Sequence, residues 1–565
     1  MKRKKNNVPN YVITLPLITE PWQEDLLEKH FYHINQLENK FIYIVKSLIK
    51  KNINKFNKIK DLNKQIRNFP PEEKRTEEQE KELKKLKDSR KETLLSITTD
   101  EVPGLKSYPK TCSFFTENGF IAVLNKLLYD NIGGKDEQGN DLTYTSLFPC
   151  IGAIITSEIA KNKYSAFEDF MFGDGEDIHY KKLSETKTVP YNISQNKPLC
   201  TVDRENKRLI LRKTKGFNKG KTMFLPFKLK KPNNEKVKEG IIYEEMALNS
   251  RIVKVTIKRE MVRGKYKYYA QLTVEGTPYP KGRSLGKGTI GDDPGVKHIT
   301  IYGNQVLQYS VPDEILNLEK KEADIERAID RSRRLHNPNK YNDDGTINVN
   351  NKDKWIITKN CRKLMNRKKE IKRKMRAKRN VCEDEFVNKV LLEGNEIHVE
   401  KTNIKGMAKR AKGIRYKKDG TYQSNKRYGK SIGNAAPSRV NGKIKNKFKY
   451  LGGTYIEINS IDAKATGTDH TKLTKSNNFS DYTKEEYYTK IENGKAIQLS
   501  NGDIHDRDAH SAFNLKHFNH ITKKYDIIGM KEDYDKFCKA ENDAFERNEL
   551  DRKKLMKYQS TVKNN

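Results

Sequence analysis

The stretch TIGDDPGVKHITIYGNQVLQYSV, residues 289–311, decides how the second half of this chain folds. It holds three short apolar runs rich in β-branched and aromatic residues, which favour strands. Pro294-Gly295 and Gly303-Asn304 separate the runs, and such pairs mark turns. Short runs joined by tight turns predict a three-stranded antiparallel meander.

The segments that follow extend this meander into a larger domain. A helical hairpin is expected at about 313–334 and 355–393, followed by the strand NEIHVE at 395–400. We then expect a helix near 436–450, the strand TYIEI at 454–458, and a final helix after Asp508. The order βββ-α-β-α-β-α is that of an RNase H-like fold, a mixed sheet with helices on its faces.

The first half of the chain has a different pattern. A strand at 11–17 precedes a long amphipathic helix at about 20–60. The charged segment 71–97 is either a solvated helical hairpin or a surface facing nucleic acid. We expect the first strand to pair with a β-rich module, so that the helices between them form an insertion. Further helices are predicted near 117–130 and 148–165, and strands at 207–211, 222–229, 252–257 and 266–274.

Charge is the dominant property of the composition. Lysine and arginine number 113 and aspartate and glutamate 75, so the formal net charge is 113 − 75 = +38. The excess is spread along the whole sequence, and a field of this kind attracts polyanions. A solubility surface is the alternative, but +38 is far above the ~2–8 of a typical small soluble domain. Nucleic acid is therefore the expected partner.

Cysteine spacing and hydropathy argue against zinc-ribbon, disulfide-rich, secreted and membrane-spanning proteins. Six cysteines lie far apart with no C-x-x-C pair, which argues against a zinc ribbon and a disulfide framework. A reducing cytoplasm is the natural location, and no structural zinc is expected. No signal peptide follows the basic N-terminus, and no apolar run is long enough to cross a bilayer, so we expect no membrane partner.

Three acidic residues fall where this fold would bring side chains together. Asp293 ends the first strand of the meander, Glu400 ends the strand at 395–400, and Asp508 opens the last helix. Phosphodiester hydrolysis needs an activated water and neutralised charge, which paired Mg²⁺ ions held by carboxylates supply. Taken singly, the three are also explained as a turn former, a strand-end residue and a helix cap. Asp292 precedes Asp293, and strand alternation places it on the opposite face.

Three motifs carry a resemblance to a known family. GDDPGVKHITIYG (291–303), NEIHVEKTNIKGM (395–407) and DRDAHSAFNL (506–515) resemble, in order, the RuvC motifs of TnpB nucleases and type V CRISPR effectors. The segment 430–459 and the hairpin at 251–275 are also similar to parts of that family. The resemblance covers roughly residues 250–520, and it places Asp293 rather than Asp292, and Asp508 rather than Asp506, among the metal ligands.

The resemblance implies a multidomain α+β protein. Its expected parts are an RNase H-like (RuvC) mixed-sheet nuclease domain, a β-barrel-like wedge domain and a helical recognition domain. The expected division is a first wedge strand at 1–18, a helical recognition domain at 19–190, a wedge β domain at 191–285, a nuclease domain with a basic helical hairpin at 286–459, a target-strand-loading insertion at 460–500, and the last motif with its helix and a basic tail at 501–565.

The sequence departs from the family pattern in two places. His510 stands where asparagine is usual, and the four-cysteine ribbon is absent from residues 460–500. That segment resembles a cysteine-less branch of the family with a DH-T element at Asp469, His470 and Thr471. His470 either contacts substrate or orders the loop, and we favour the second interpretation.

Two basic segments are candidates for nucleic-acid binding. Arg367 to Arg379 is almost entirely of one charge sign, which a purely structural helix would avoid through self-repulsion, although a solvated charged helix is the alternative. Lys405 to Lys430 interleaves lysines with tyrosines that can stack bases, or it is a disordered basic loop. The residues predicted to contact nucleic acid are Arg367, Lys368, Lys372, Arg373, Arg376, Lys405, Lys409, Arg410, Tyr416 and Arg507.

Together these features predict an RNA-guided DNA endonuclease with one RuvC-like site. The expected cofactor is Mg²⁺, as two ions, with Mn²⁺ as an alternative. The expected partners are a guide RNA of CRISPR or transposon origin, a double-stranded DNA target and its displaced strand. The alternatives are a guide-dependent repressor without cleavage and an unguided structure-specific nuclease. A cytoplasmic protein of prokaryotic, phage or mobile-element origin is expected, as a monomer or a dimer.

Overall fold

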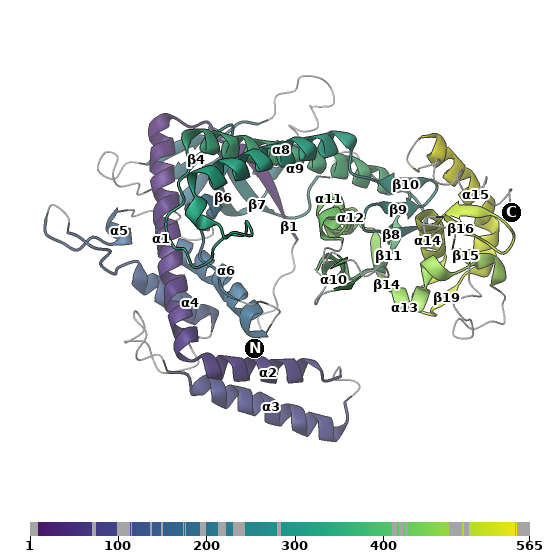
Figure 1. Ribbon diagram of the computed structural model, residues 1–565, viewed down its shortest axis with the longest axis horizontal. Coiled ribbons are helices and arrows are strands. Elements are labelled where there is room, and N and C mark those ends of the chain that lie inside the picture. The colour runs from purple at the N-terminus through teal and green to yellow at the C-terminus, as the bar shows by residue number, and fades with distance from the viewer. Residues whose placement is uncertain are drawn as a thin grey trace. The chain divides into compact units, whose positions relative to one another are not determined.

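The computed structural model consists of two compact units, Met1–Tyr279 and Pro280–Asn565, which are described separately (Figure 1). The described residues are 9–70, 75–98, 114, 116–135, 138–147, 151–172, 175, 177–192, 199–212, 222–229, 243–279, 284–409, 415–416, 422–423, 428–473, 489–490, 496–547 and 550. Within them, no helix has the length and apolar character needed to span a membrane.

Helices make up much of the first unit. The prediction of one continuous helix at 20–60 is wrong. The helix is interrupted at Asn52, which separates α1 (Pro21–Lys51) from α2 (Ile53–Arg67). The Asn52 side chain donates to the Leu48 and Thr98 carbonyls and so competes with the helical pattern. The other helices are α3 (Glu77–Leu95), α4 (Glu117–Leu127), α5 (Tyr144–Leu147) and α6 (Ala153–Phe172).

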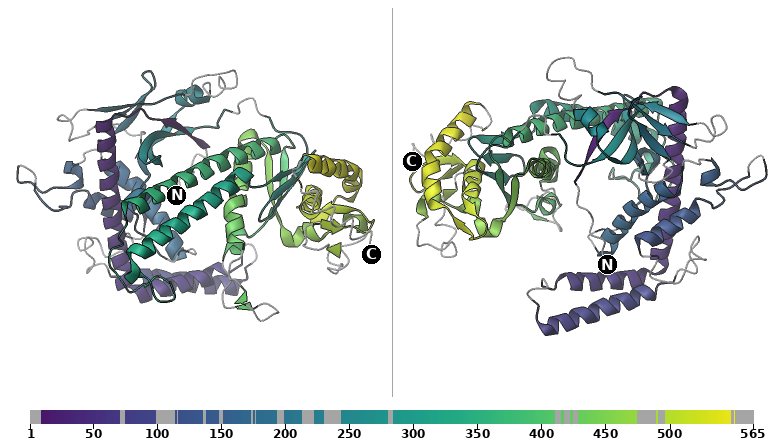
Figure 2. Two further views of the ribbon diagram at one scale, coloured as in Figure 1. Left: turned by 45° about the horizontal axis from the view of Figure 1, so that its top comes forward. Right: turned by 180° about the vertical axis from the view of Figure 1, so that it is seen from behind.

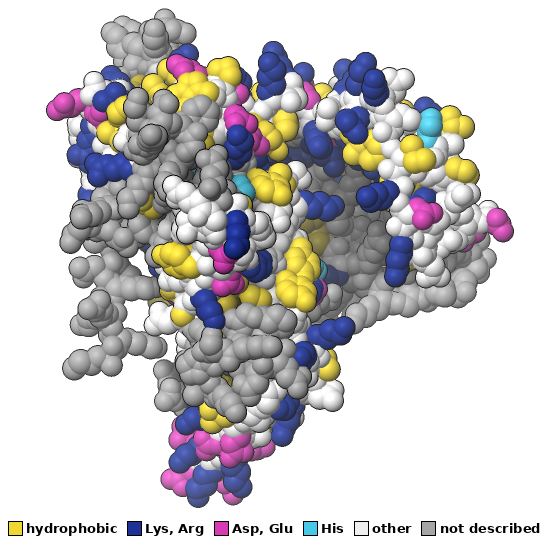
Figure 3. Space-filling view, turned by 90° about the vertical axis from the view of Figure 1, so that its left-hand side faces the viewer, with side chains coloured by type: hydrophobic (Ala, Val, Ile, Leu, Met, Phe, Trp, Pro, Cys, Tyr) yellow, Lys and Arg dark blue, Asp and Glu magenta, His cyan; other side chains and the backbone are white. Residues whose placement is uncertain are grey.

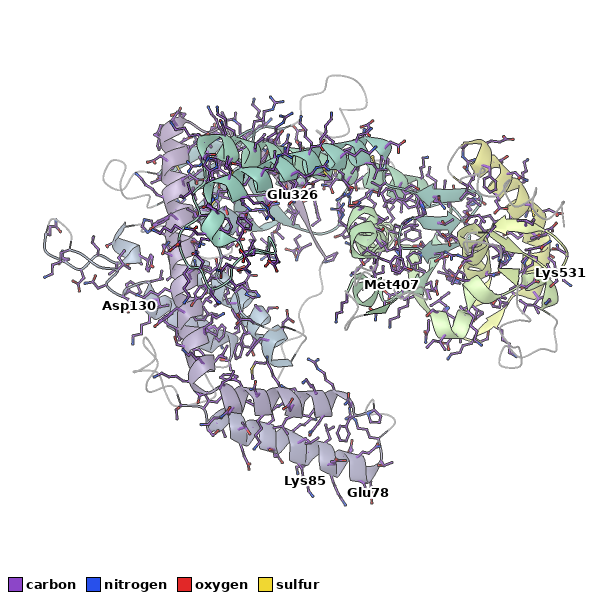
Figure 4. The ribbon with its side chains drawn as sticks, viewed as in Figure 1. Glu78, Lys85, Asp130, Glu326, Met407 and Lys531 are labelled. Carbon is purple, nitrogen blue, oxygen red and sulfur yellow. The ribbon has the colours of Figure 1, made fainter. Side chains whose placement is uncertain are left out.

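Helix α3 packs beside α2 (Figure 2), with Leu83 buried, so the described part of 71–97 contributes one arm of a hairpin instead of forming one by itself. The surface of α3 carries both signs of charge, and Glu78 and Lys85 both extend outward from it (Figure 4). At the bottom of Figure 3, acidic and basic side chains are likewise mixed. This arm is therefore not a uniformly basic surface.

Two sheets share the core of the first unit. One has the order β1-β7-β6-β2 and the other β3-β4-β5, and an isolated bridge joins Leu17 to Phe227. The predicted pairing of the first strand is confirmed, with Tyr11 opposite Val274 of β7. The described strands form two sheets joined by this bridge, and the barrel-like wedge domain stays a prediction. Their bounds are β1 (Asn10–Pro16), β2 (Thr188–Asn192), β3 (Cys200–Asp203), β4 (Arg208–Leu211), β5 (Met223–Pro226), β6 (Ile252–Val262) and β7 (Lys265–Glu275).

The second unit is built on a five-stranded mixed sheet of order β10-β9-β8-β11-β14. The predicted meander is confirmed, since β8, β9 and β10 are antiparallel, whereas β8, β11 and β14 are parallel. The strands are β8 (Thr289–Pro294), β9 (Ile299–Tyr302), β10 (Val306–Tyr309), β11 (Glu396–Lys401) and β14 (Thr454–Asn459).

Helices cover both faces of this sheet (Figure 1). On one face, α12 (Pro437–Leu451) and the end of α9 (Lys359–Val390) pack on Ile290, Ile397 and Val399. On the other face lies α14 (Arg507–Lys516), with α15 (Ile527–Glu546) beyond it. Helix α15 was not predicted. The predicted hairpin is α8 (Asp313–His336) with α9.

Short elements complete the second unit. They are α10 (Ile404–Ala408), β12 (Arg415–Tyr416), β13 (Tyr422–Gln423), α11 (Gly429–Ala435), α13 (Ser460–Ala463), β15 (Thr489–Lys490), β16 (Ala496–Gln498), β17 (Ile504–Asp506), β18 (Phe518–Asn519) and β19 (Lys524–Tyr525).

Helix α14 lies against β8 at Gly291. A Cβ atom at this position would lie 1.9 Å from the Ala512 carbonyl oxygen and 2.7 Å from the Lys516 backbone nitrogen. His398 of the neighbouring strand β11 reinforces the contact, because its Nδ1 lies 3.0 Å from the Leu515 carbonyl oxygen. The helix therefore sits on the sheet at a distance that only glycine allows.

We expect Gly291→Ala to destabilise the second unit by about 1–3 kcal/mol or more, because a backbone carbonyl cannot move aside as a side chain can. Thermal or urea unfolding of the full chain measures this. The matched control is Gly442→Ala in α12, where a Cβ meets nothing within 4 Å. That change should stabilise the helix by up to about 1 kcal/mol. Equal stability of the two variants would contradict the close approach of α14.

Candidate active site

Asp293 and Glu400 lie at the same end of two adjacent parallel strands. Asp292 of β8 is in register with Val399 of β11, so Asp293 and Glu400 are the next residues along each strand. Adjacent strands are about 4.8 Å apart, and residues in register point to the same face. Gly291 and His398, two positions earlier, face α14, so strand alternation turns Asp293 and Glu400 toward α14 as well.

Asp508 reaches this end of the sheet from the first turn of α14. Asp506 caps the helix, because its Oδ1 accepts hydrogen bonds from the backbone nitrogens of Asp508 and Ala509, both at 3.0 Å. The turn after β8 runs beside Asp508, and a Cβ on Gly295 would lie 3.9 Å from Asp508 Oδ2. The structure therefore brings together all three carboxylates that the sequence predicted.

Burial and mutual repulsion dominate the electrostatics of this cluster. Burial raises the pKa of Asp293 well above its usual range, and the Asp508 and Glu400 carboxylates raise it further, while a hydrogen bond from Ser511 opposes the rise. Burial also raises the pKa of Glu400, and Asp508 adds to that rise. Burial and the Asp508 carboxylate raise the pKa of Asp506 to about 7. Such a cluster favours a bound cation.

Arg507 supplies a cation from within the chain. Its Nε and Nη2 donate to Asp508 Oδ1 at 2.8 and 2.6 Å. The same guanidinium lowers the pKa of Asp293 and of Glu400, so it lies within electrostatic reach of all three carboxylates. The sequence prediction placed Arg507 among the nucleic-acid contacts and did not anticipate this ion pair.

Asp292 lies on the opposite face of β8, as strand alternation predicted. It is fully buried, and neither carboxylate oxygen has a hydrogen-bond partner among the described residues. Burial raises the pKa of Asp292 to about 8, and the Glu400 carboxylate contributes to the rise. A carboxyl group in this setting is protonated near neutral pH, so Asp292 is an unsuitable metal ligand.

The donor chemistry of the cluster suits a hard divalent cation. Three carboxylates offer only oxygen donors, which Mg²⁺ and Mn²⁺ prefer. Within the described residues, however, no three His, Cys, Asp or Glu side chains are arranged so that they hold a metal ion as they stand. The side chains fit the ion by type and location, and binding requires them to converge further.

Two buried histidines connect α14 to the segment around residue 470. His470 Nδ1 lies 2.9 Å from His510 Nε2, and both rings are buried. The Asn514 side chain of α14 donates to the carbonyls of Ala465 and Thr468 at 2.9 Å. Burial lowers the pKa of His470 to about 4 and that of His510 well below its usual range, so both rings are neutral. This environment fits the interpretation that His470 orders its segment.

A further network positions the start of α14, and sequence reasoning missed it. Glu541 of α15 accepts from the Asp506 backbone nitrogen at 2.8 Å and bonds His505 Nδ1 at 2.7 Å. The other ring nitrogen of His505 bonds Tyr534 at 2.7 Å. A polar residue on the apolar face of a helix after position 527 is a sequence signal that could have revealed Glu541.

The basic candidates on α9 fall into two groups. Lys368 donates to Glu326 of α8 at 2.6 Å, and Lys372 lies 3.2 Å from Glu322. Arg373 donates to Glu370 at 2.7 Å. Nearby glutamates thus balance these three cations, and nucleic-acid binding by this helix stays a prediction. Arg367 and Arg376 are exposed.

The remaining candidates lie on the segment after β11. Lys405 belongs to α10, and Lys409, which is exposed, ends that helix. Tyr416 lies in β12, opposite Tyr422 of β13. Arg410 lies outside the described residues.

Comparison with known proteins gives a limited result. No protein-family model matches the chain, and no curated protein matches it. Among solved structures, the chain is similar to a Cas12f1 protein in complex with single-guide RNA and target DNA, at 13% identity and a TM-score of 0.40, over 90% of this chain and 99% of that one. It is also similar to a CRISPR-Cas12f ternary complex protein (13%, TM-score 0.23, 90% and 98%) and to Cas12i bound to crRNA and double-stranded DNA (10%, TM-score 0.26, 88% and 70%). These values are too low to assign a family, so the functional argument depends on the residues of the site.

We expect the stability of the second unit to fall as pH rises from about 6.5 to 8, above the range in which the buried neutral rings of His470 and His510 have the opposite effect. The folded pKa of Asp292, about 8, lies above the usual 3.8, so in this window the folded state holds a proton that the unfolded state has lost. One such group changes the free energy of unfolding by up to about 1.4 kcal/mol per pH unit. Asp292→Asn cannot ionise and should show a smaller decrease, measured by urea unfolding in EDTA. Asp535→Asn, an exposed change on α15, is the control and should keep the wild-type slope. Identical slopes for Asp292→Asn and wild type would contradict this account of Asp292.

Proposed function

We propose that this protein is an RNA-guided, Mg²⁺-dependent DNA endonuclease with a single RuvC-like site formed by Asp293, Glu400 and Asp508. The observation that carries the proposal is the meeting of these carboxylates at one end of a mixed sheet. Two come from adjacent parallel strands and one from the first turn of the helix on that face. The sheet order and the helices on both faces support an RNase H-like fold for this unit.

The residues of the site have distinct roles in this proposal. Asp293 and Asp508 would bind the metal directly, and Glu400 would bind or bridge. Bound Mg²⁺ would supply an activated water and neutralise charge on the scissile phosphate. Asp506 holds the first turn of α14 in place through its cap, and Ser511 orients Asp293. Asp292, protonated on the other face, takes no part in ligation.

RNA guidance is inferred from the sequence resemblance together with the charge of the chain. The three motifs occur in the same order as in the TnpB and type V nucleases, and a net charge of +38 suits a protein that holds long polyanions. In this proposal the protein binds a structured guide RNA through contacts to the RNA backbone. Base pairing between the guide and the DNA then selects the target. The displaced strand then enters the carboxylate site.

Two alternative functions can be distinguished from the proposed one by experiment. A guide-dependent repressor would bind target DNA without cutting it. An unguided structure-specific nuclease would cut branched DNA without RNA. Sequencing the RNA that co-purifies with the protein distinguishes guidance from its absence. We expect one discrete, abundant RNA, whereas a preparation that lacks specific RNA and still cuts branched DNA would establish the unguided enzyme.

We expect Asp293→Asn to reduce cleavage of guide-matched DNA by about a hundredfold or more, because it removes a charge that acts on the transition state. Guide and target binding should stay close to wild type, as measured by filter binding. Asp535→Asn is the matched control and should cleave normally. Full cleavage by Asp293→Asn would contradict the site, and absence of Mg²⁺-dependent cleavage by the wild-type complex would favour the repressor.

A further inference from the structure

The guanidinium of Arg507 forms an ion pair with one carboxylate of the candidate site, that of Asp508. Both of its donor nitrogens, Nε and Nη2, contact the same oxygen, Asp508 Oδ1, at 2.8 and 2.6 Å. The ion pair is partly shielded, since the Asp508 side chain is 19% exposed and the Arg507 side chain 34%. An ion pair in such a setting is stronger than one in open solvent.

The same cation also acts on the other two carboxylates. The Arg507 charge also lies within electrostatic reach of Asp293 and Glu400. One positive charge within the cluster therefore stabilises all three ionised acids. It also repels a second cation and takes a donor oxygen that a metal ion would need. These two effects lower the affinity of the site for a divalent ion.

Arginine has a better partner than a lone carboxylate when nucleic acid is present. Its planar guanidinium binds phosphate through two parallel hydrogen bonds and is less strongly hydrated than an ammonium group. A phosphate at the site would pair with Arg507 and draw it away from Asp508, and a metal ion would then replace Arg507 as the partner of Asp508. The oxygen of Asp508 would then become available as the backbone phosphate arrives.

We propose that Arg507 is a built-in counter-ion of the carboxylate cluster, which nucleic acid displaces, so that divalent metal binding and nucleic-acid binding strengthen each other. This inference rests on the proposed function, because it assumes that the cluster holds a metal ion. Linkage requires the coupling to be reciprocal: DNA raises metal affinity by the same factor by which metal raises DNA affinity. The site would then load its metal mainly when substrate is in place.

The test measures metal binding and needs no cleavage. Mn²⁺ is titrated into the full chain, freed of nucleic acid, and free Mn²⁺ is followed by electron paramagnetic resonance. The titration is repeated with a short single-stranded DNA that carries a non-hydrolysable backbone. The variants are Arg507→Gln, which removes the cation, and Arg331→Gln, an exposed arginine on α8 with the same change in charge.

Without DNA, we expect Arg507→Gln to bind Mn²⁺ about 5–150 times more tightly than wild type, the usual range of coupling between sites. DNA should tighten Mn²⁺ binding by wild type and by Arg331→Gln, but leave Arg507→Gln almost unchanged. Equal or weaker Mn²⁺ binding by Arg507→Gln without DNA would overturn the proposal.

Asp508→Asn separates this inference from the proposed function. If wild type and Arg507→Gln bind Mn²⁺ equally and Asp508→Asn abolishes binding, the metal site stands and the counter-ion role falls. If none of the proteins binds Mn²⁺ with or without DNA, the metal site and the counter-ion role both fall. Circular dichroism of each variant establishes that the fold is intact.

Discussion

The candidate site depends on one backbone contact, the close approach of α14 to β8 at Gly291. The Ala512 carbonyl occupies the space that any other residue would fill with its Cβ. This approach aligns the first turn of the helix with the strand end, so Asp508 comes beside the turn that follows Asp293. Without it, Asp508 would not reach the end of the sheet where strand pairing places Asp293 and Glu400. Packing of α14 on β8 therefore sets the positions of the carboxylates, and their charges act within that arrangement.

The fold accepts an electrostatic cost at this point. Partly buried carboxylates repel one another, and each would be more stable in water. Nearby groups offset part of the cost: the cap at Asp506, the hydroxyl of Ser511 and the guanidinium of Arg507. Such an arrangement is typical of functional sites, where side chains are held in positions that stability alone would not favour.

Much of the second unit, Pro280–Asn565, could be predicted from the sequence, because its strands are short apolar runs between clear turns. The positions of Asp293, Glu400 and Asp508 at element ends followed from the same pattern. The break at Asn52 could not be predicted, because it depends on a hydrogen bond to Thr98, far along the chain. The pairing of Lys368 with Glu326 was missed for a similar reason, since the charge of α9 was considered without its neighbour α8.

The hydrogen bond between His470 and His510 determines how this part of the protein responds to oxidants and to acid. In the described residues, imidazole and amide hydrogen bonds hold the segment around Thr468 to α14, and residues 460–500 contain no cysteine. Thiol oxidants have no target in such a contact. Acid does, because two adjoining buried rings cannot both accept a proton without separating. The contact between His470 and His510 itself is thus independent of thiol chemistry and vulnerable to low pH.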